Sequence, residues 1–189
     1  LPGLKRSPPE SDIREVRNYV LALEYGLERL SSLPVSLRYI CELHERLMSG
    51  VRGDHATPGE FRRSQNWIGA PGCTLNTATY VPPPASEMVI CLDAFERYLY
   101  VSDDYPPLIR LAFIHQQFES IHPFLDGNGR IGRLLISLLT IHWNLLPSPL
   151  LYLSAFFERR RQEYYDLLLA VNERGAWREW VEFFLIGVA

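Results

Sequence analysis

His122-Pro123-Phe124-Leu125-Asp126-Gly127-Asn128-Gly129-Arg130-Ile131-Gly132-Arg133 is the most informative stretch of this 189-residue chain. It leads directly into an apolar run, Leu134 to Leu139, which predicts a buried helix. The first N–H groups of a helix have no partner within the helix and carry partial positive charge. Glycines let an anion approach such groups closely. The stretch therefore predicts a phosphate-binding turn at the start of a helix.

Two side chains of this stretch can act on a bound phosphate. His122 precedes Pro123, which favours an extended loop conformation over a helix. A histidine pKa of roughly 6.5 suits proton abstraction near neutral pH. Asp126 takes the N-cap position and could hold Mg²⁺ through one carboxylate, as Mg²⁺ sites on nucleotides commonly do. We therefore predict that His122 is a catalytic base and that Asp126 is a metal ligand.

Arg130 and Arg133 lie three residues apart, so we expect both on one helix face, where they can clamp further phosphates. Each feature alone has an ordinary explanation, such as a solvated loop histidine or a plain capped turn. A calcium-binding loop is excluded because the alternating oxygen ligands and the downstream glutamate are missing. The combination in one ordered stretch favours phosphate chemistry over packing alone.

Composition narrows the function class. The formal net charge is −3, so the chain offers no basic surface for nucleic acid or an anionic membrane. The longest apolar-rich stretch, 134–146, is too short to cross a membrane. The chain has three scattered cysteines, too few for a disulfide framework or a zinc site: Cys41, Cys73 and Cys91. Four further histidines show no metal-ligand spacing: His44, His55, His115 and His142. We expect a cytoplasmic protein of bacterial origin.

The hydrophobic periodicity predicts a mainly α fold with one domain, 12–189, after a proline-containing arm, 1–11. The first helix should bury a stripe made of Val16, Tyr19, Val20, Leu23, Leu27 and Leu30. The predicted helices cover about 12–30, 34–47, 86–100, 107–120, the motif to 143, 157–172 and 177–188. Extended segments at 62–68 and 77–81 flank a turn rich in Gly, Pro and Asn. They predict a β-hairpin flap at about residues 60–82.

The central stretch matches the pattern H-x-F-x-[DE]-G-N-G-R-x-x-R at every specified position, and in this the chain resembles the Fic-domain proteins. The resemblance covers most of the chain, from about residue 16 onward. Segments 61–69 and 80–84 resemble the family's flap, and 118–121 its lead-in helix. Segments 163–172 and 177–180 resemble its C-terminal helices. The resemblance implies a Fic-type helical fold with a flap.

The resemblance also implies an activity: transfer of AMP from ATP to a Ser, Thr or Tyr hydroxyl of a protein, with release of pyrophosphate. His122 would deprotonate the hydroxyl, and Asp126 would coordinate Mg²⁺ between the α- and β-phosphates. Arg130 and Arg133 would hold the β- and γ-phosphates. The residues implied to bind ATP are Asp126, Gly127, Asn128, Gly129, Arg130, Ile131, Gly132, Arg133, Tyr164, Asn172, Ile68 and Gly69.

Several of these roles have alternatives. Tyr164 and Asn172 would line the adenosine end of the nucleotide, or would serve as a core aromatic and a helix cap. The flap at Ile68 and Gly69 would pair with an extended segment of a protein target. Other possible partners are the chain itself, through self-modification, and a second copy in a homodimer. Two other functions remain open: phosphoryl or phosphocholine transfer, and nucleotide-dependent regulation without catalysis.

Many proteins of this family carry an inhibitory helix with the pattern [ST]-x-x-x-E-[GN], whose glutamate pairs with the second motif arginine, here Arg133. The nearest look-alike surrounds Glu24 and fails, because Val20 and Tyr25 stand at the flanking positions. We therefore expect the inhibitory helix to lie outside this chain. Arg133 would then be unrestrained, and this chain would be more active than a longer form. A DNA-binding domain could also lie outside it.

Overall fold

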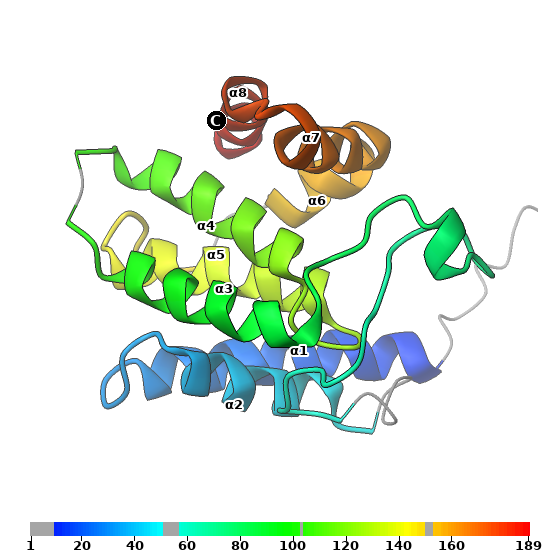
Figure 1. The fold of residues 1–189 in the computed structure, drawn as a ribbon. Coiled ribbons are helices and arrows are strands. Elements are labelled where there is room, and N and C mark those ends of the chain that lie inside the picture. Colours follow the sequence, from blue (N-terminus) through cyan, green and yellow to red (C-terminus); the bar gives the residue numbers. More distant parts are fainter. Residues whose placement is uncertain (1–9, 51–56, 103, 150–152) are drawn as a thin grey trace, which may run out of the picture.

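The computed structural model of the chain describes residues 10–50, 57–102, 104–149 and 153–189. These residues form eight α-helices: α1 (Glu10–Arg29), α2 (Leu37–Met48), α3 (Ala85–Leu99), α4 (Pro107–Ile121), α5 (Asn128–His142), α6 (Leu153–Arg159), α7 (Arg161–Arg174) and α8 (Trp177–Val188). In Figure 1, α1 and α2 form one layer, α3 to α5 a second, and α6 to α8 a third. The predicted mainly α fold is confirmed.

The core lies around α5, the helix that follows the motif. Its apolar residues are almost fully buried, among them Leu134, Leu138 and Leu139. Phe118 of α4 packs into the same core. Burying each such side chain contributes roughly 1.5–3 kcal/mol. The core thus fixes the N-terminal end of α5, which is the end that carries the glycine turn.

Helix α1 departs from the predicted stripe. Tyr19, Leu23, Leu27 and Leu30 pack against the core, but Val16 is 67% exposed and Val20 46% exposed. Two small residues, Ala22 and Gly26, are buried in the same helix and add to this contact. A Cβ at Gly26 would lie 2.8 Å from the Tyr39 hydroxyl and 2.9 Å from Leu138. The predicted inward face is therefore correct for Tyr19, Leu23, Leu27 and Leu30 and wrong for Val16 and Val20.

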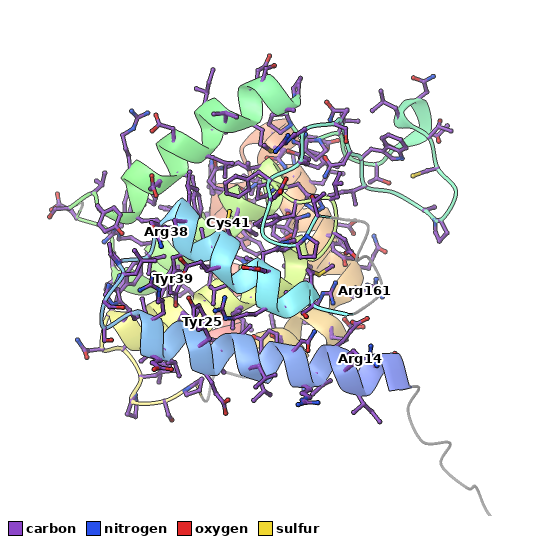
Figure 2. All side chains as sticks on the ribbon, turned by 90° about the horizontal axis from the view of Figure 1, so that it is seen from below. Arg14, Tyr25, Arg38, Tyr39, Cys41 and Arg161 are labelled. Carbon is purple, nitrogen blue, oxygen red and sulfur yellow. The ribbon has the colours of Figure 1, made fainter. Side chains whose placement is uncertain are left out.

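Polar contacts join α1 to α2. The Tyr25 hydroxyl donates to Glu42 Oε2 at 2.6 Å, and Arg29 Nε donates to the same oxygen at 3.0 Å. Tyr39 of α2 donates to the Gly26 carbonyl at 2.9 Å. Tyr25 and Tyr39 are labelled in Figure 2, which is seen from the side of these two helices. The paired helices α1 and α2 pack against the motif segment, through Glu15 and His44.

Two predicted boundaries need correction. Helix α1 begins at Glu10, so residues 10 and 11 belong to it and Asp12 is not its N-cap. Residues 1–9 of the predicted arm lie outside the described residues. The single helix predicted over 157–172 is two helices, because the backbone leaves helical geometry at Arg160, with φ −114° and ψ 37°.

The flap is not the predicted β-hairpin. Its only pairing among the described residues is one antiparallel bridge, between Ile68 and Tyr80. The Ile68 N–H donates to the Tyr80 carbonyl at 2.9 Å, and the 3-10 turn η2 (Leu75–Thr77) lies near its tip. Prolines at 71 and 82–84 lack the N–H that a ladder needs. In Figure 1 the flap extends from the helical body beside the start of α5.

Candidate active site

The motif joins α4 to α5 through a sharp turn. His122 ends α4 in the left-handed region, with φ 49° and ψ 60°, instead of the predicted extended conformation. Pro123 excludes the right-handed helical region for the residue before it but not this one. Gly127 precedes α5 with φ 81°. A Cβ there would lie 2.8 Å from Met48 Sδ, so glycine is needed for space as well as for backbone geometry.

A buried arginine, which the sequence analysis did not single out, holds His122 in this conformation. Arg62 is 2% exposed, and its Nε donates to the His122 carbonyl at 2.9 Å. Its Nη1 donates to the Ser64 carbonyl at 3.1 Å and its Nη2 to the Pro83 carbonyl at 2.5 Å. Arg62 thus ties both ends of the flap to the motif loop.

The His122 ring has a defined protonation pattern. Its Nδ1 lies 3.2 Å from the Glu119 carbonyl, which can only accept, so Nδ1 carries the proton. Burial lowers the pKa of His122 to about 4, so the ring is neutral at neutral pH. The ring lines a pocket. An unprotonated Nε2 beside a pocket can accept a proton from a substrate hydroxyl.

This pocket has a volume of about 580 Å³ and lies between the flap, α4, α5 and α7. The residues that the sequence predicted for the site and that line it are Ile68, Gly69, His122, Gly129, Arg133, Tyr164 and Asn172. The N–H groups of Asn128, Gly129 and Arg130 precede the first paired N–H of α5, which belongs to Ile131 and donates to Gly127. The pocket therefore combines a base, a guanidinium and a helix N-terminus.

Other predicted residues lie elsewhere. Ile131 is fully buried in the core, so its side chain cannot touch a nucleotide. Gly132 is buried against α4, where a Cβ would lie 3.1 Å from the His115 ring and would overlap Glu119. The Asn128 amide is used within the loop, since it accepts from the Phe124 N–H and donates to the Phe124 carbonyl, both at 2.8 Å.

The two motif arginines do not share a face, contrary to the prediction. Arg133 lines the pocket. Arg130 points toward α1, with Nη1 3.3 Å from Glu15 Oε2 and Nη2 3.6 Å from Asp126 Oδ2. Residues three apart lie about 60° from each other around the helix. This angle is enough to direct Arg133 into the pocket and Arg130 toward α1.

Helix α2 adds a second residue that the sequence analysis missed. His44 is fully buried and stacks on Phe124, with ring centroids 3.7 Å apart. Its Nδ1 accepts from the Gly59 N–H at 2.9 Å, so its Nε2 carries the proton and donates to the Asp126 carbonyl at 3.0 Å. Burial lowers the pKa of His44 to about 4. A histidine far from the motif in sequence gives no signal of this contact.

Helix α4 carries two further buried polar groups close to the pocket, the His115 ring and Oε1 of Glu119. His115 is buried and bonds to the Tyr164 hydroxyl, with Nε2 and the hydroxyl oxygen 2.9 Å apart. Burial lowers the pKa of His115 to about 3. Glu119 lines the pocket, and its shielded Oε1 has no hydrogen-bond partner among the described residues. Burial raises the pKa of Glu119 to about 7, against the opposing effect of Arg133.

Tyr164 and Asn172, which were predicted to line the adenosine end of the nucleotide, both line the pocket, but part of each side chain is already hydrogen-bonded within the protein. Tyr164 is 3% exposed and its hydroxyl is turned to His115, so only its ring can face a ligand. Asn172 is exposed, and its Oδ1 accepts from Gln116 Nε2 at 3.2 Å and from Ser120 Oγ at 3.0 Å. Its amide nitrogen is therefore the group left for a ligand.

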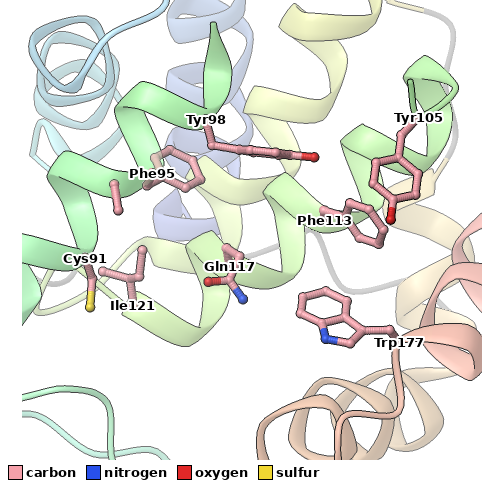
Figure 3. A pocket seen from close by; sticks show the side chains of 9 residues that line it. Cys91, Phe95, Tyr98, Tyr105, Phe113, Gln117, Ile121 and Trp177 are labelled. Carbon is pink, nitrogen blue, oxygen red and sulfur yellow. The ribbon is translucent and has the colours of Figure 1, made fainter. Parts of the chain in front are cut away.

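A second pocket, of about 710 Å³, lies between α3, α4 and α8. Figure 3 shows the aromatic side chains of Tyr98, Tyr105, Phe113 and Trp177 around it. It shares no lining residue with the pocket beside His122. Its lining has one amide, from Gln117, and no base or guanidinium. The smaller pocket is therefore the candidate active site.

Asp126 can serve as a metal ligand only together with groups from a substrate. Within the described ranges, no three His, Cys, Asp or Glu side chains lie together as a metal site. The Asp126 side chain is 52% exposed at the start of α5. One accessible carboxylate suits Mg²⁺ that takes its other ligands from phosphates and water. No helix in the described part of the chain is long and apolar enough to span a bilayer.

Comparison with known proteins identifies relatives over most of the chain. The family described as Fic/DOC matches residues 34–140. A protein adenylyltransferase Fic from Drosophila persimilis is 31% identical over 172 residues, which cover 89% of this chain and 30% of the relative. The Drosophila virilis protein of the same name is 32% identical, with coverage of 89% and 32%. The chain thus spans about a third of the length of these relatives.

Solved structures share the fold. A Fic family protein from Desulfovibrio desulfuricans G20 has a TM-score of 0.79 and 26% identity, and covers 96% of this chain and 52% of its own. Fic-1 (residues 134–508) from C. elegans has a TM-score of 0.70 and 22% identity, with coverage of 98% and 52%. At these identities the match establishes the helical architecture around the motif.

Proposed function

Because the chain belongs to the Fic/DOC family, we propose that it is a protein adenylyltransferase, which moves AMP from ATP to a hydroxyl side chain of a protein. The names of its Drosophila relatives support this activity. The observation that carries the proposal is the neutral His122 ring in the same pocket as Arg133 and the free N–H groups of α5. A base beside an anion site suits attack of a hydroxyl on a phosphate.

The proposed transfer exchanges one bond at the α-phosphorus for another. The target oxygen forms a bond to the α-phosphorus, and its proton passes to Nε2 of His122. The bond from the α-phosphorus to the bridging oxygen breaks, and pyrophosphate leaves with that bond's electrons. The N–H groups at the start of α5 stabilise the charge that grows on the α-phosphate. Arg133 holds the outer phosphates.

Asp126 would hold Mg²⁺, whose positive charge would neutralise the phosphates when it is bound. Its exposed carboxylate beside the α5 N-terminus supports this role. A protein target would lie along the flap, where Ile68 and Gly69 line the pocket and Trp67 is 43% exposed. Self-modification, a homodimer, a cytoplasmic location and a bacterial source stay predictions.

Transfer of radiolabel from ATP tests the proposal. The chain is incubated with Mg²⁺ and a protein acceptor, with ATP labelled at either the α- or the γ-phosphate. We expect protein-bound label from the α-position and none from the γ-position. Label from the γ-position alone would mean phosphoryl transfer instead. Nucleotide binding with no transfer to any acceptor would favour a regulatory binding protein.

A further inference from the structure

Arg130 lies between two carboxylates that come from different parts of the chain. Its Nη1 is 3.3 Å from Oε2 of Glu15, on α1, and its Nη2 is 3.6 Å from Oδ2 of Asp126, in the motif loop. The Arg130 side chain is only 20% exposed, and Nη2 also contacts Met48 Sδ at 3.2 Å. Packing therefore keeps the guanidinium at the α1 side of α5, away from the pocket that Arg133 lines.

Asp126 is fixed on its other sides by neutral groups. Its carbonyl accepts from His44 Nε2 at 3.0 Å, and its Oδ1 accepts from the Gly127 N–H at 2.5 Å. Among the described residues, Arg130 is the cationic side chain that forms an ion pair with Oδ2 of Asp126. The surroundings of Oδ2 therefore depend on the position of Arg130, and Glu15 forms the shorter of the two ion pairs of Arg130.

We propose that Glu15 is a positioning residue, which draws Arg130 toward α1 so that Arg130 orients Asp126 without neutralising it. The inference rests on the proposed function, since it concerns the carboxylate that would hold Mg²⁺. One guanidinium shared by two carboxylates leaves a net charge of −1, which a cation can still bind. Arg130 accordingly acts on Asp126, and Arg133 alone acts on the outer phosphates.

Replacing Glu15 by Gln tests this relationship. Without the Glu15 charge, Arg130 moves onto Asp126 and competes with Mg²⁺. We expect the Mg²⁺ concentration for half-maximal ATP binding to rise about two- to fivefold, the range set by a partly exposed ion pair. Binding of ATP and AMP in EDTA should be unchanged. Glu24→Gln is the matched control, because Glu24 is exposed on the same helix.

An unchanged Mg²⁺ requirement in Glu15→Gln would overturn the inference. So would a selective gain in metal-free ATP affinity over AMP affinity, because it would mean that Glu15 restrains Arg130 from binding phosphate. Calorimetry reports binding, and a thermal melt of each variant shows whether the fold is intact.

A comparison of the two arginines provides a second test. In EDTA, Arg133→Gln should reduce the preference for ATP over AMP, whereas Arg130→Gln should preserve it. Equal loss in both variants would contradict the separate roles. If the wild-type chain binds no nucleotide, the proposed function and this inference fail together. If it transfers AMP but Glu15→Gln behaves like Glu24→Gln, only the inference fails.

Discussion

Arg62 Nε donates to the main-chain carbonyl of His122 at 2.9 Å, so a buried guanidinium from the flap sets the backbone of the proposed base. The same side chain donates to carbonyls of Ser64 and Pro83. Its donors reach carbonyl oxygens of three separate residues, which requires both the length and the planar donor array of arginine.

Replacing Arg62 by Leu should destabilise the fold by about 3 kcal/mol or more, because several buried carbonyls lose their donor. Arg62→Lys should lower the free energy of unfolding less than Arg62→Leu does. It should still reduce AMP transfer, since one ammonium cannot reach all the carbonyls. Thermal unfolding and label transfer measure the two effects. Arg63→Leu is the control, because the Arg63 side chain is 89% exposed. If Arg62→Leu and Arg63→Leu melted alike, the proposed bracing would be wrong.

Two glycines of α5 should differ in their tolerance of a methyl group. At Gly132 a Cβ would overlap the Glu119 carboxylate and press on the His115 ring. Gly132→Ala should therefore cost about 1–3 kcal/mol, as overpacking does. At Gly129 the nearest atom is the end of the Arg133 side chain, at 3.2 Å, which can move aside.

Chemical denaturation of both variants measures this difference, and Glu119→Ala supplies a further check. In the Glu119→Ala background, Gly132→Ala should recover part of its lost stability, because the main clash is gone. Equal costs for Gly132→Ala in both backgrounds would show that Glu119 does not occupy the space over Gly132.

Acid should destabilise the protein through its buried histidines. Burial lowers the pKa of His44 to about 4 and of His115 to about 3, below roughly 6.5 in an unfolded chain. Between these values only the unfolded state takes up the proton, so stability falls as pH falls below about 6.5. Glu119 acts in the opposite sense: its raised pKa of about 7 lets the native state bind a proton first.

Urea unfolding at pH 7, 6 and 5 checks these signs. The wild type should lose stability toward pH 5. The Glu119→Gln variant lacks the opposing protonation. Its free energy of unfolding should therefore fall more steeply with decreasing pH, by about 1.4 kcal/mol per pH unit. A shallower loss in Glu119→Gln would contradict the assignment of the raised pKa to this carboxyl.

The rate of AMP transfer should depend little on His122 titration between pH 5.5 and 8. Burial lowers the pKa of His122 to about 4, with Glu119, Arg62 and Asp126 as its polar neighbours. An ordinary histidine would lose about tenfold in base form near pH 5.5. Initial rates across this range, compared in Glu119→Gln to remove its titration, measure the effect. A tenfold fall with a midpoint near 6.5 would mean that His122 is solvated.

The sequence predicted most of the fold because the helical periodicity is strong and the prolines and glycines lie at helix ends. Pro107 starts α4 and Gly175 ends α7 with φ 69°. Errors arose where tertiary contacts override local pattern. Val16 and Val20 of α1 are exposed although the periodicity placed them inward, and the flap has one bridge where two extended segments predicted a hairpin.

Within the site, the sequence predicted the residues of the motif but not how they divide between pocket and support. A spacing of three did not reveal that Arg130 and Arg133 face different elements, because only packing against α1 distinguishes them. Arg62, His44 and Glu119 escaped notice because their contacts join segments distant in sequence. Their common property is burial of a polar group, which single-sequence patterns do not reveal.

The most direct test of the account is the initial rate of label transfer from α-labelled ATP by the wild type and by His122→Ala, with ATP affinity measured in parallel. We predict that the variant loses about 10²- to 10⁴-fold in rate, as removal of a general base does, while its ATP affinity stays within about twofold, because Arg133 and the start of α5 still bind the phosphates. A variant that retains more than about a tenth of the wild-type rate would contradict the role of His122.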